Sequence, residues 1–122
     1  MEFCFDNVRD NILIVKASGT LNSRAAAQFR ESIGKMVEVR LWNIIVDCSE
    51  LDDLSIYGLF VLVRLHRQVE NKFGDVKIAS ASGWLVTTLR RTRLNRQFKI
   101  YPDIQSACEA FKKVKKTPLI LR

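Results

Sequence analysis

The residue types best suited to chemistry gather in one short part of the chain. An apolar run at residues 44–46 is followed by a polar segment that contains Asp52, Asp53 and Ser55, and then by an apolar helical pattern. The run is typical of a buried parallel strand, and open α/β sheets place functional sites where such a strand leads into a helix. The helix N-terminus offers free N–H groups and partial positive charge, which favour an anion such as phosphate.

Asp52 and Asp53 are the first candidates for catalysis or metal binding. Adjacent carboxylates point in different directions, however, and no third ligand lies nearby in the sequence. We expect them to solvate the loop and to favour the helix N-terminus electrostatically. Ser55 has two interpretations: an N-cap whose hydroxyl accepts an orphan N–H, or a phosphoacceptor. We favour the cap.

Two aromatic residues, Tyr57 and Phe60, lie near the start of this helix. The spacing places Leu59, Leu62, Val69 and Phe73 toward the core, which leaves either Phe60 and Val61 or Tyr57 and Phe60 for another face. An exposed aromatic beside an acidic loop is typical of a protein contact. The alternative is a second helix layer that covers it, and both interpretations stay open here.

Nothing in the sequence predicts an enzyme. There is no Ser-His-Asp order, no glycine-rich phosphate loop and no metal-ligand spacing, so we expect no catalytic residue, metal or cofactor. His66, the only histidine, is expected to be a hydrogen-bonded residue at the core boundary. The three cysteines, Cys4, Cys48 and Cys108, are expected to be buried reduced thiols.

The hydrophobic periodicity predicts a single α/β domain. The order of elements is β-β-α-β-α-β-α-β-α, an N-terminal β-hairpin followed by parallel β-α crossovers. We expect the domain at residues 1–112 and a basic C-terminal tail at 113–122. The expected strands are 2–6, 11–18, 43–48, 76–80 and 98–101, and the expected helices are 22–37, 56–73, 83–93 and one that begins near Pro102.

Charge is distributed unevenly along the chain. Residues 1–61 carry six basic and nine acidic side chains, whereas residues 62–122 carry 14 basic and four acidic ones, for a total of +7. The basic half could make weak contact with an anionic surface. No aromatic residues interleave its arginines, so we expect no nucleic acid. With no long apolar segment and no signal-peptide pattern, we expect the protein in the cytoplasm.

Five short motifs follow one another on the expected elements: Gly19-Thr20-Leu21-Asn22, Ile45-Val46-Asp47-Cys48-Ser49, Ser55-Ile56-Tyr57-Gly58, Leu89-Arg90-Arg91-Thr92-Arg93-Leu94, and Phe98-Lys99-Ile100-Tyr101 with Ala107. They resemble Gly-x-Leu-Asp, Val-x-Leu-Asp-Leu-Ser, Asp-Ser-x-Gly, Leu-x-x-x-Gly-Leu and Phe-x-Ile-Tyr…Ala of the STAS domain family. That family includes bacterial anti-sigma-factor antagonists, and the resemblance covers roughly residues 10–111.

The departures from the family pattern concern its switch. In signalling members, the Ser or Thr after the loop Asp is phosphorylated by an anti-sigma kinase, and that position here is Ile56. Ser55 stands in place of the Asp, Asn22 in place of the Asp after Leu21, and Arg93 in place of a Gly. Isoleucine has no hydroxyl, so we expect the phosphorylation switch to be lost.

The resemblance implies a non-enzymatic regulatory protein in transcription and signal transduction that docks a partner, an anti-sigma factor kinase. The docking surface would be loop 50–57 and the start of the following helix. Its residues are Asp52, Asp53, Ser55, Ile56, Tyr57, Gly58 and Phe60. Two alternatives remain: a cytoplasmic STAS subunit that regulates a membrane transporter, with a transporter ATPase subunit as partner, and a small-ligand sensor that uses the same loop.

Overall fold

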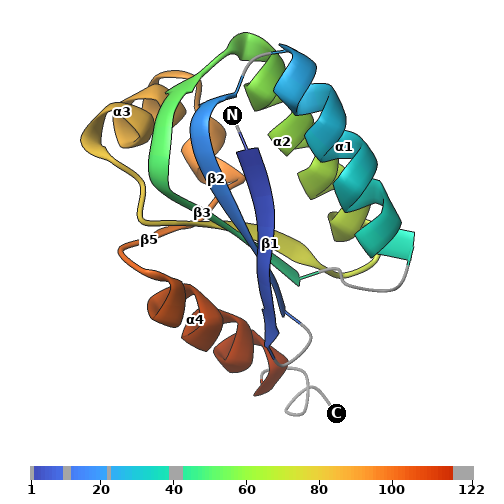
Figure 1. Ribbon diagram of the computed structural model, residues 1–122. Coiled ribbons are helices and arrows are strands. Elements are labelled where there is room, and N and C mark those ends of the chain that lie inside the picture. The colour runs from blue at the N-terminus through green and yellow to red at the C-terminus, as the bar shows by residue number, and fades with distance from the viewer. Residues whose placement is uncertain (1, 10–11, 22, 39–42, 117–122) are drawn as a thin grey trace.

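The computed structural model describes residues 2–9, 12–21, 23–38 and 43–116 and confirms the predicted order of elements (Figure 1). A short 3-10 turn, η1, spans Leu94–Arg96. The strands are β1 (Glu2–Arg9), β2 (Ile12–Leu21), β3 (Asn43–Leu54), β4 (Asp75–Ala79) and β5 (Ile100–Tyr101), and the helices are α1 (Ser23–Glu38), α2 (Ile56–Glu70), α3 (Gly83–Arg91) and α4 (Ile104–Lys116).

The five strands form one sheet in the order β1-β2-β3-β4-β5. β1 pairs antiparallel with β2 as the predicted hairpin, and all the other neighbours are parallel. β3 is therefore the central strand, as its continuous apolar run predicts. β5 lies at the edge of the sheet and is shorter than the expected strand at 98–101, since only Ile100 and Tyr101 pair with β4. Gly19 adopts a positive φ of 73° beside a register shift between β2 and β3, a conformation that glycine accepts without steric cost.

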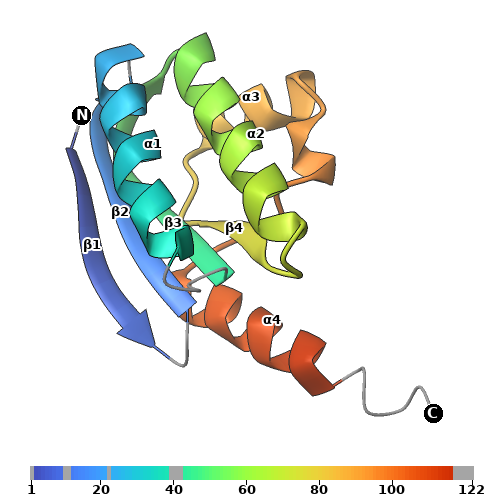
Figure 2. The same ribbon diagram turned by 90° about the vertical axis from the view of Figure 1, so that its right-hand side faces the viewer.

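The sheet is covered on both faces, and alternating strand residues form the two halves of the core. Leu13, Val15 and Val46 pack on one face with residues of α2 and α3. Ile14 and Ile45 pack on the other face, against Ala107, Cys108 and Phe111 of α4. Figures 1 and 2 show α1 and α2 side by side across one face and α4 alone across the other.

The end of β3 differs from the prediction. The segment expected to be a loop, from residue 49 onward, continues as strand to Leu54. It pairs with the end of β2, where Ser18 faces Glu50 and Leu21 faces Leu54, after register shifts that bend the two strands together. The acidic residues have low strand propensity, but the pairing with β2 outweighs that preference.

The end of α2 also differs from the prediction. The helix stops at Glu70, and Phe73 adopts a left-handed conformation with φ 63°. The N–H of Phe73 donates to the Glu70 carbonyl at 3.0 Å, and the N–H of Gly74 donates to the Val69 carbonyl at 2.7 Å. These two bonds form a Schellman motif, with phenylalanine at the position where glycine is usual. Phe73, predicted to lie in the core, is consequently fully exposed.

The last helix extends beyond residue 112. α4 begins after Asp103, whose carboxylate accepts the Ser106 N–H at 2.7 Å, and it ends at Lys116. The domain boundary after residue 112 stays a prediction, and residues 117–122 lie outside the described part. None of the helices in the described ranges is long and apolar enough to cross a membrane.

Candidate functional site

The predicted site lies where β3 ends and α2 begins. Asp52 and Asp53 are both exposed at the end of β3. The Asp53 carboxylate accepts the neighbouring Leu54 N–H at 2.8 Å. Among the residues that the structure describes, no group of three or more His, Cys, Asp and Glu side chains is arranged to hold a metal. The structure thus places both carboxylates as exposed negative charges beside the N-terminus of α2, a position that favours negative charge.

Ser55 is the N-cap of α2, as predicted. Its backbone is extended, with φ −76° and ψ 167°, and its hydroxyl accepts the Gly58 N–H at 3.2 Å. The Ser55 carbonyl accepts the Leu59 N–H at 3.1 Å and so starts the helical ladder. Gly58 is buried, which places the backbone of the first turn close against the core. The hydroxyl therefore has a structural task, since it satisfies an otherwise orphan donor.

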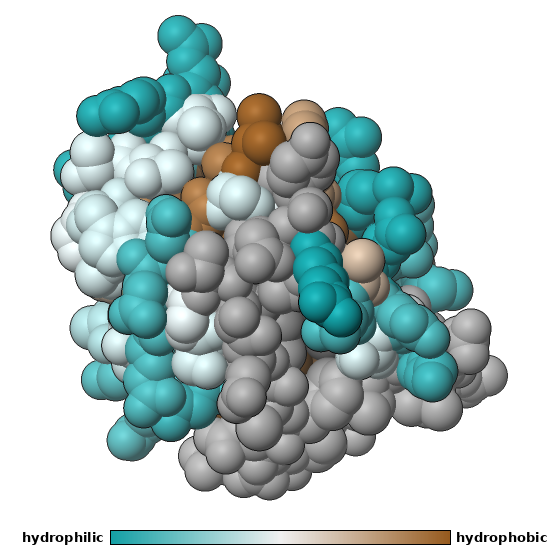
Figure 3. All heavy atoms as spheres, turned by 45° about the horizontal axis from the view of Figure 1, so that its top comes forward, coloured by the Kyte–Doolittle hydropathy of each residue, from teal (hydrophilic) through white to brown (hydrophobic). Residues whose placement is uncertain are grey.

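An apolar face projects from the first turns of α2. Ile56 is 62% exposed and Phe60 is 58% exposed. Because they are four residues apart, they lie on the same side of the helix. No second helix layer covers Phe60 in the described part of the chain, while Val61 beside it is buried. The side chain of Tyr57 lies outside the described part. Figure 3 looks onto this end of the molecule and shows apolar atoms gathered between hydrophilic side chains.

A packed apolar floor supports this surface. Leu51 at the end of β3 is buried, and it lines a cavity of about 10 Å³ together with Cys48, Leu62 and Leu85. That volume holds at most one water molecule, so a small ligand does not fit beneath the segment. Burial, reinforced by the charge of Asp47, raises the pKa of the Cys48 thiol to about 12. The segment therefore rests on a packed apolar layer, and burial holds the Cys48 thiol in its unreactive neutral form.

Sequence reasoning missed part of the environment of His66. The residue is buried, as expected for the core boundary, but it has acidic partners. Its Nδ1 lies 3.7 Å from Glu70 Oε2, and its Nε2 lies 3.2 Å from Asp75 Oδ1. The Glu70 contact was readable as an i,i+4 pair, whereas the Asp75 contact depends on how β4 lies against α2. Lys77, also unnoticed in the sequence, is 4% exposed and donates to Asp75 Oδ2 at 2.9 Å.

Exposed basic residues gather on two of the described surfaces. The first, which we call the cluster after α3, begins in the last turn of that helix and consists of Arg90, Arg91, Arg93, Arg96 and Lys99. The second, which sequence reasoning missed, is a hollow of about 270 Å³ between α1 and α2, lined by Arg30, Arg64, Arg67, Gln68 and Asn71. No acidic side chain is among its described lining residues. Both surfaces can attract an anionic partner.

The family model of the STAS domain matches residues 6–107 of the chain. A comparison with curated proteins finds no match. Solved structures share the fold, and three of them illustrate it. A candidate anti-sigma factor antagonist from Thermotoga maritima aligns with a TM-score of 0.82 at 21% identity, over 89% of this chain and 92% of that one.

The second structure, SpoIIAA from Bacillus in its phosphorylated form, aligns with a TM-score of 0.73 at 16% identity, over 90% of this chain and 99% of that one. The third, a sulfate transporter family protein from Wolinella succinogenes, aligns with a TM-score of 0.76 at 14% identity, over 92% and 93%. At these identities the likeness extends to the fold, which antagonists and a transporter protein share.

Proposed function

Because the chain belongs to the STAS domain family, we propose that it is a regulatory binding protein of the anti-sigma-antagonist type. It acts without enzymatic chemistry, in the cytoplasm, by docking a protein partner such as an anti-sigma factor kinase. The docking surface is the segment 50–57 with the start of α2. The observation that carries this proposal is the exposed pair Ile56 and Phe60, which lie on one side of α2 next to the exposed carboxylates of Asp52 and Asp53.

The arrangement matches the anatomy of a protein interface. Large apolar side chains at the centre of a contact supply most of the binding free energy, and polar residues around them supply orientation and association rate. Ile56 and Phe60 provide the apolar centre, and Asp52 and Asp53 lie on its acidic rim. The packed floor under Leu51 keeps the surface in one shape, which lowers the entropic cost of binding.

The same surface lacks the hydroxyl on which the family switch depends. A phosphate at this helix N-terminus would add about −1.5 to −2 charge to the contact surface. Ile56 cannot accept one, and the Ser55 hydroxyl caps the helix. Binding in this protein is therefore controlled by the amount of protein or of its partner, or by another signal, and not by serine phosphorylation at position 56.

A capture experiment with matched variants tests the proposal. The wild-type protein, Ile56→Glu and Phe73→Glu are immobilised and exposed to a lysate of the native host, and the captured proteins are identified by mass spectrometry. Phe73 is the control, because it is also an exposed apolar residue and lies just beyond the other end of α2. We expect the wild type and Phe73→Glu to retain a kinase-like protein that Ile56→Glu loses. Equal capture by all three proteins would contradict the proposed surface.

The second candidate function is that of a transporter-regulating STAS subunit. The exposed basic cluster after α3 favours it, since such a surface suits an acidic loop or the anionic face of a membrane. In the same capture experiment, this function predicts recovery of a transporter subunit. That recovery would be insensitive to Ile56→Glu and would be lost when Arg90 and Arg91 are changed to glutamate.

A further inference from the structure

The exposed face of α2 changes in character along its length. Four of its exposed residues recur at helical spacing and project within about 80° of one another around the helix axis. From the first turn to the last, they are Ile56, Phe60, Arg64 and Arg67. The face that begins with the apolar pair of the docking surface therefore ends in basic side chains, about 10 Å beyond Phe60.

The basic end of this face is hollowed. Arg64 and Arg67 line the hollow from α2, and Arg30 lines it from α1. Its volume of about 270 Å³ can receive side chains of a neighbouring surface. In the described part of the chain, none of these three arginines has an ion-pair partner. Such guanidinium groups favour a carboxylate from another molecule, which they can bind with two hydrogen bonds at once.

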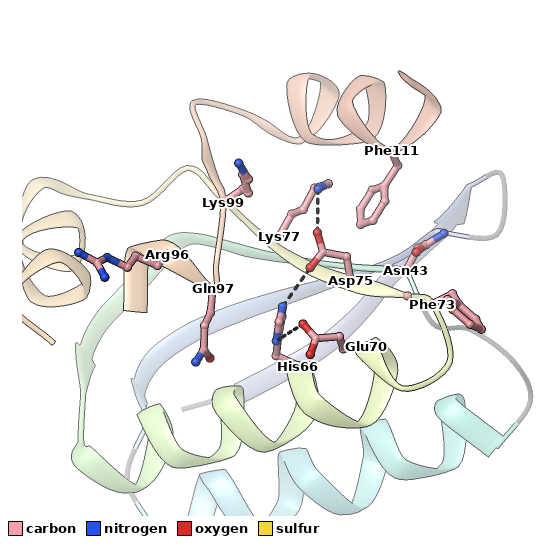
Figure 4. A pocket seen from close by; sticks show the side chains of 11 residues that line it. Asn43, His66, Glu70, Phe73, Asp75, Lys77, Arg96, Gln97, Lys99 and Phe111 are labelled. Carbon is pink, nitrogen blue, oxygen red and sulfur yellow. Dashed lines mark hydrogen bonds and ion pairs between the residues drawn. The ribbon is translucent and has the colours of Figure 1, made fainter. Parts of the chain in front are cut away.

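The carboxylates near the end of α2 are engaged elsewhere. Glu70 Oε2 lies 3.7 Å from His66 Nδ1, and Asp75 Oδ2 accepts from the Lys77 ammonium at 2.9 Å (Figure 4). These contacts join α2 to β4, whereas the hollow lies between α2 and α1. No acidic side chain is among the described residues that line the hollow. Its positive charge is therefore not neutralised within the described part of the chain.

Negative charge lies at the other end of this face. Asp52 and Asp53 are exposed where β3 leads into α2. Asp53 accepts the Leu54 N–H within its own segment, and neither carboxylate has an ion-pair partner among the described residues. Along the chain, Ile56 and Phe60 separate these carboxylates from the basic hollow. The order is thus acidic, apolar and basic.

A surface with this order is complementary to a second copy of itself. A two-fold axis close to Phe60 places the acidic end of each copy against the basic hollow of the other, as an isologous contact requires. The two Phe60 side chains then meet at the axis with Ile56 beside them, which removes apolar area from water. A parallel arrangement of two copies would instead place like charges together, at a cost in free energy. The charges therefore select the antiparallel arrangement.

We propose that the protein forms a weak two-fold dimer through this face, in which Asp52 and Asp53 of each copy contact Arg64 and Arg67 of the other. A contact of this width belongs among the small interfaces, so we expect a dissociation constant in the micromolar to millimolar range. The dimer covers the docking surface. Its regulatory consequence rests on the proposed function: self-association competes with the partner protein for the same residues and sets how much of the chain can dock.

Sedimentation equilibrium of the whole protein, from about 10 µM to about 1 mM, measures the association, and two charge-reversed variants test its geometry. Asp52→Lys with Asp53→Lys makes both ends of the face basic, and Arg64→Glu with Arg67→Glu makes both ends acidic. We expect each variant alone to lose at least about tenfold in dimer affinity, because like charges then face each other. An equimolar mixture of the two should recover to within about threefold of the wild type, because opposite charges again meet at both ends. Recovery also shows that both variants are folded.

Two controls locate the contact on α2. Arg90→Glu with Arg91→Glu changes the net charge as much as the arginine reversal in α2 but lies in α3, and it should dimerise like the wild type. Phe60→Ser should weaken the dimer about tenfold, whereas Phe73→Ser, at an exposed residue beyond α2, should not.

Three results would overturn the proposal. They are a wild-type protein that stays monomeric over the whole concentration range, a mixture of the two charge-reversed variants that does not recover, and an equal loss of affinity in the α3 control. Because the experiment uses only this protein, its failure leaves the proposed docking function standing. Conversely, a dimer with these properties remains valid if the capture experiment retains no partner.

Discussion

At the scale of single residues, position 56 distinguishes this chain from the switch pattern that it resembles. Ile56 occupies the first position of α2, where a phosphate would meet free backbone N–H groups, yet it carries no hydroxyl. We predict that incubation with an anti-sigma kinase and ATP leaves the mass of the wild-type protein unchanged. Ile56→Ser should gain one phosphate, which intact-mass spectrometry would detect.

Phosphorylation of the cap residue, Ser55, is the outcome that would contradict this prediction. A stoichiometric phosphate on Ser55 in the wild-type protein would show that the acceptor has moved one residue upstream and that the switch is retained. Phosphorylation there would also remove the hydrogen bond to the Gly58 N–H in its present form, and α2 would start differently.

Cys48 offers a pH-dependent prediction. Burial, reinforced by the charge of Asp47, raises the pKa of this thiol from 9.0 to about 12 in the folded protein. Because the pKa is raised on folding, the contribution to stability is complete below pH 9 and is lost as pH rises from 9 toward 12. Denaturant melts should therefore show the free energy of unfolding falling more steeply over this window in wild type than in Cys48→Ala.

Labelling gives the control for the thiol prediction. In the native protein, Cys48 should remain unmodified by iodoacetamide near pH 8, because the thiolate is the reactive form. Cys48 should react only after the protein is denatured. Rapid modification of native Cys48 at that pH, identified by peptide mapping, would contradict a buried neutral thiol.

At the scale of elements, the sequence predicted the order of strands and helices along the chain, because each core strand is a short apolar run and each helix has one apolar stripe. It failed where tertiary pairing outweighs local preference. Residues 49–54 look like a loop, but the end of β2 recruits them into β3. Phe73 continues the apolar stripe of α2 by spacing alone, whereas the Schellman motif turns it out to solvent. The contact between His66 and Asp75 was unreadable because it joins α2 to β4.

A prediction at the scale of elements concerns the backbone at the end of α3. Arg93 adopts a left-handed conformation with φ 62°, at the position where the family pattern has glycine. That conformation costs a residue with a Cβ about 1–2 kcal/mol, and glycine would remove this cost. Because glycine loses more backbone entropy on folding, about 0.5–1 kcal/mol of the gain in stability would be offset. We predict that Arg93→Gly raises the free energy of unfolding by about 0.5–1 kcal/mol in urea melts.

A matched glycine substitution checks the origin of that gain. Arg90 is exposed like Arg93 but lies within α3 with helical backbone. Arg90→Gly should therefore lower stability by about 1 kcal/mol, the usual cost of glycine in a helix. Equal effects of the two substitutions would mean that removal of positive charge, and not the left-handed backbone, determines the result.

At the scale of the whole molecule, the fold separates the charges. The acidic side chains at the end of β3 lie at the proposed docking surface, and the exposed basic cluster follows α3. A second basic surface, the hollow between α1 and α2, brings Arg30 of the acidic half together with Arg64 and Arg67. Net charge alone cannot tell which surface would meet an anionic partner, so the two have to be changed separately.

Two charge-matched triple variants separate the surfaces. We predict that Arg90→Glu, Arg91→Glu and Arg93→Glu together abolish binding to phosphatidylserine-containing vesicles, because each basic residue near such a surface contributes about 1 kcal/mol. Arg30→Glu, Arg64→Glu and Arg67→Glu change the net charge equally but leave all five residues of the cluster after α3 intact. This second variant should retain most of the binding in vesicle co-sedimentation.

Binding by the wild type should also weaken steeply as salt rises, since the screening length falls to about 8 Å at physiological ionic strength. If both variants lose binding equally, only net charge matters. If neither loses it, the cluster after α3 is a solvated face with no role in association, and the transporter function loses its main support.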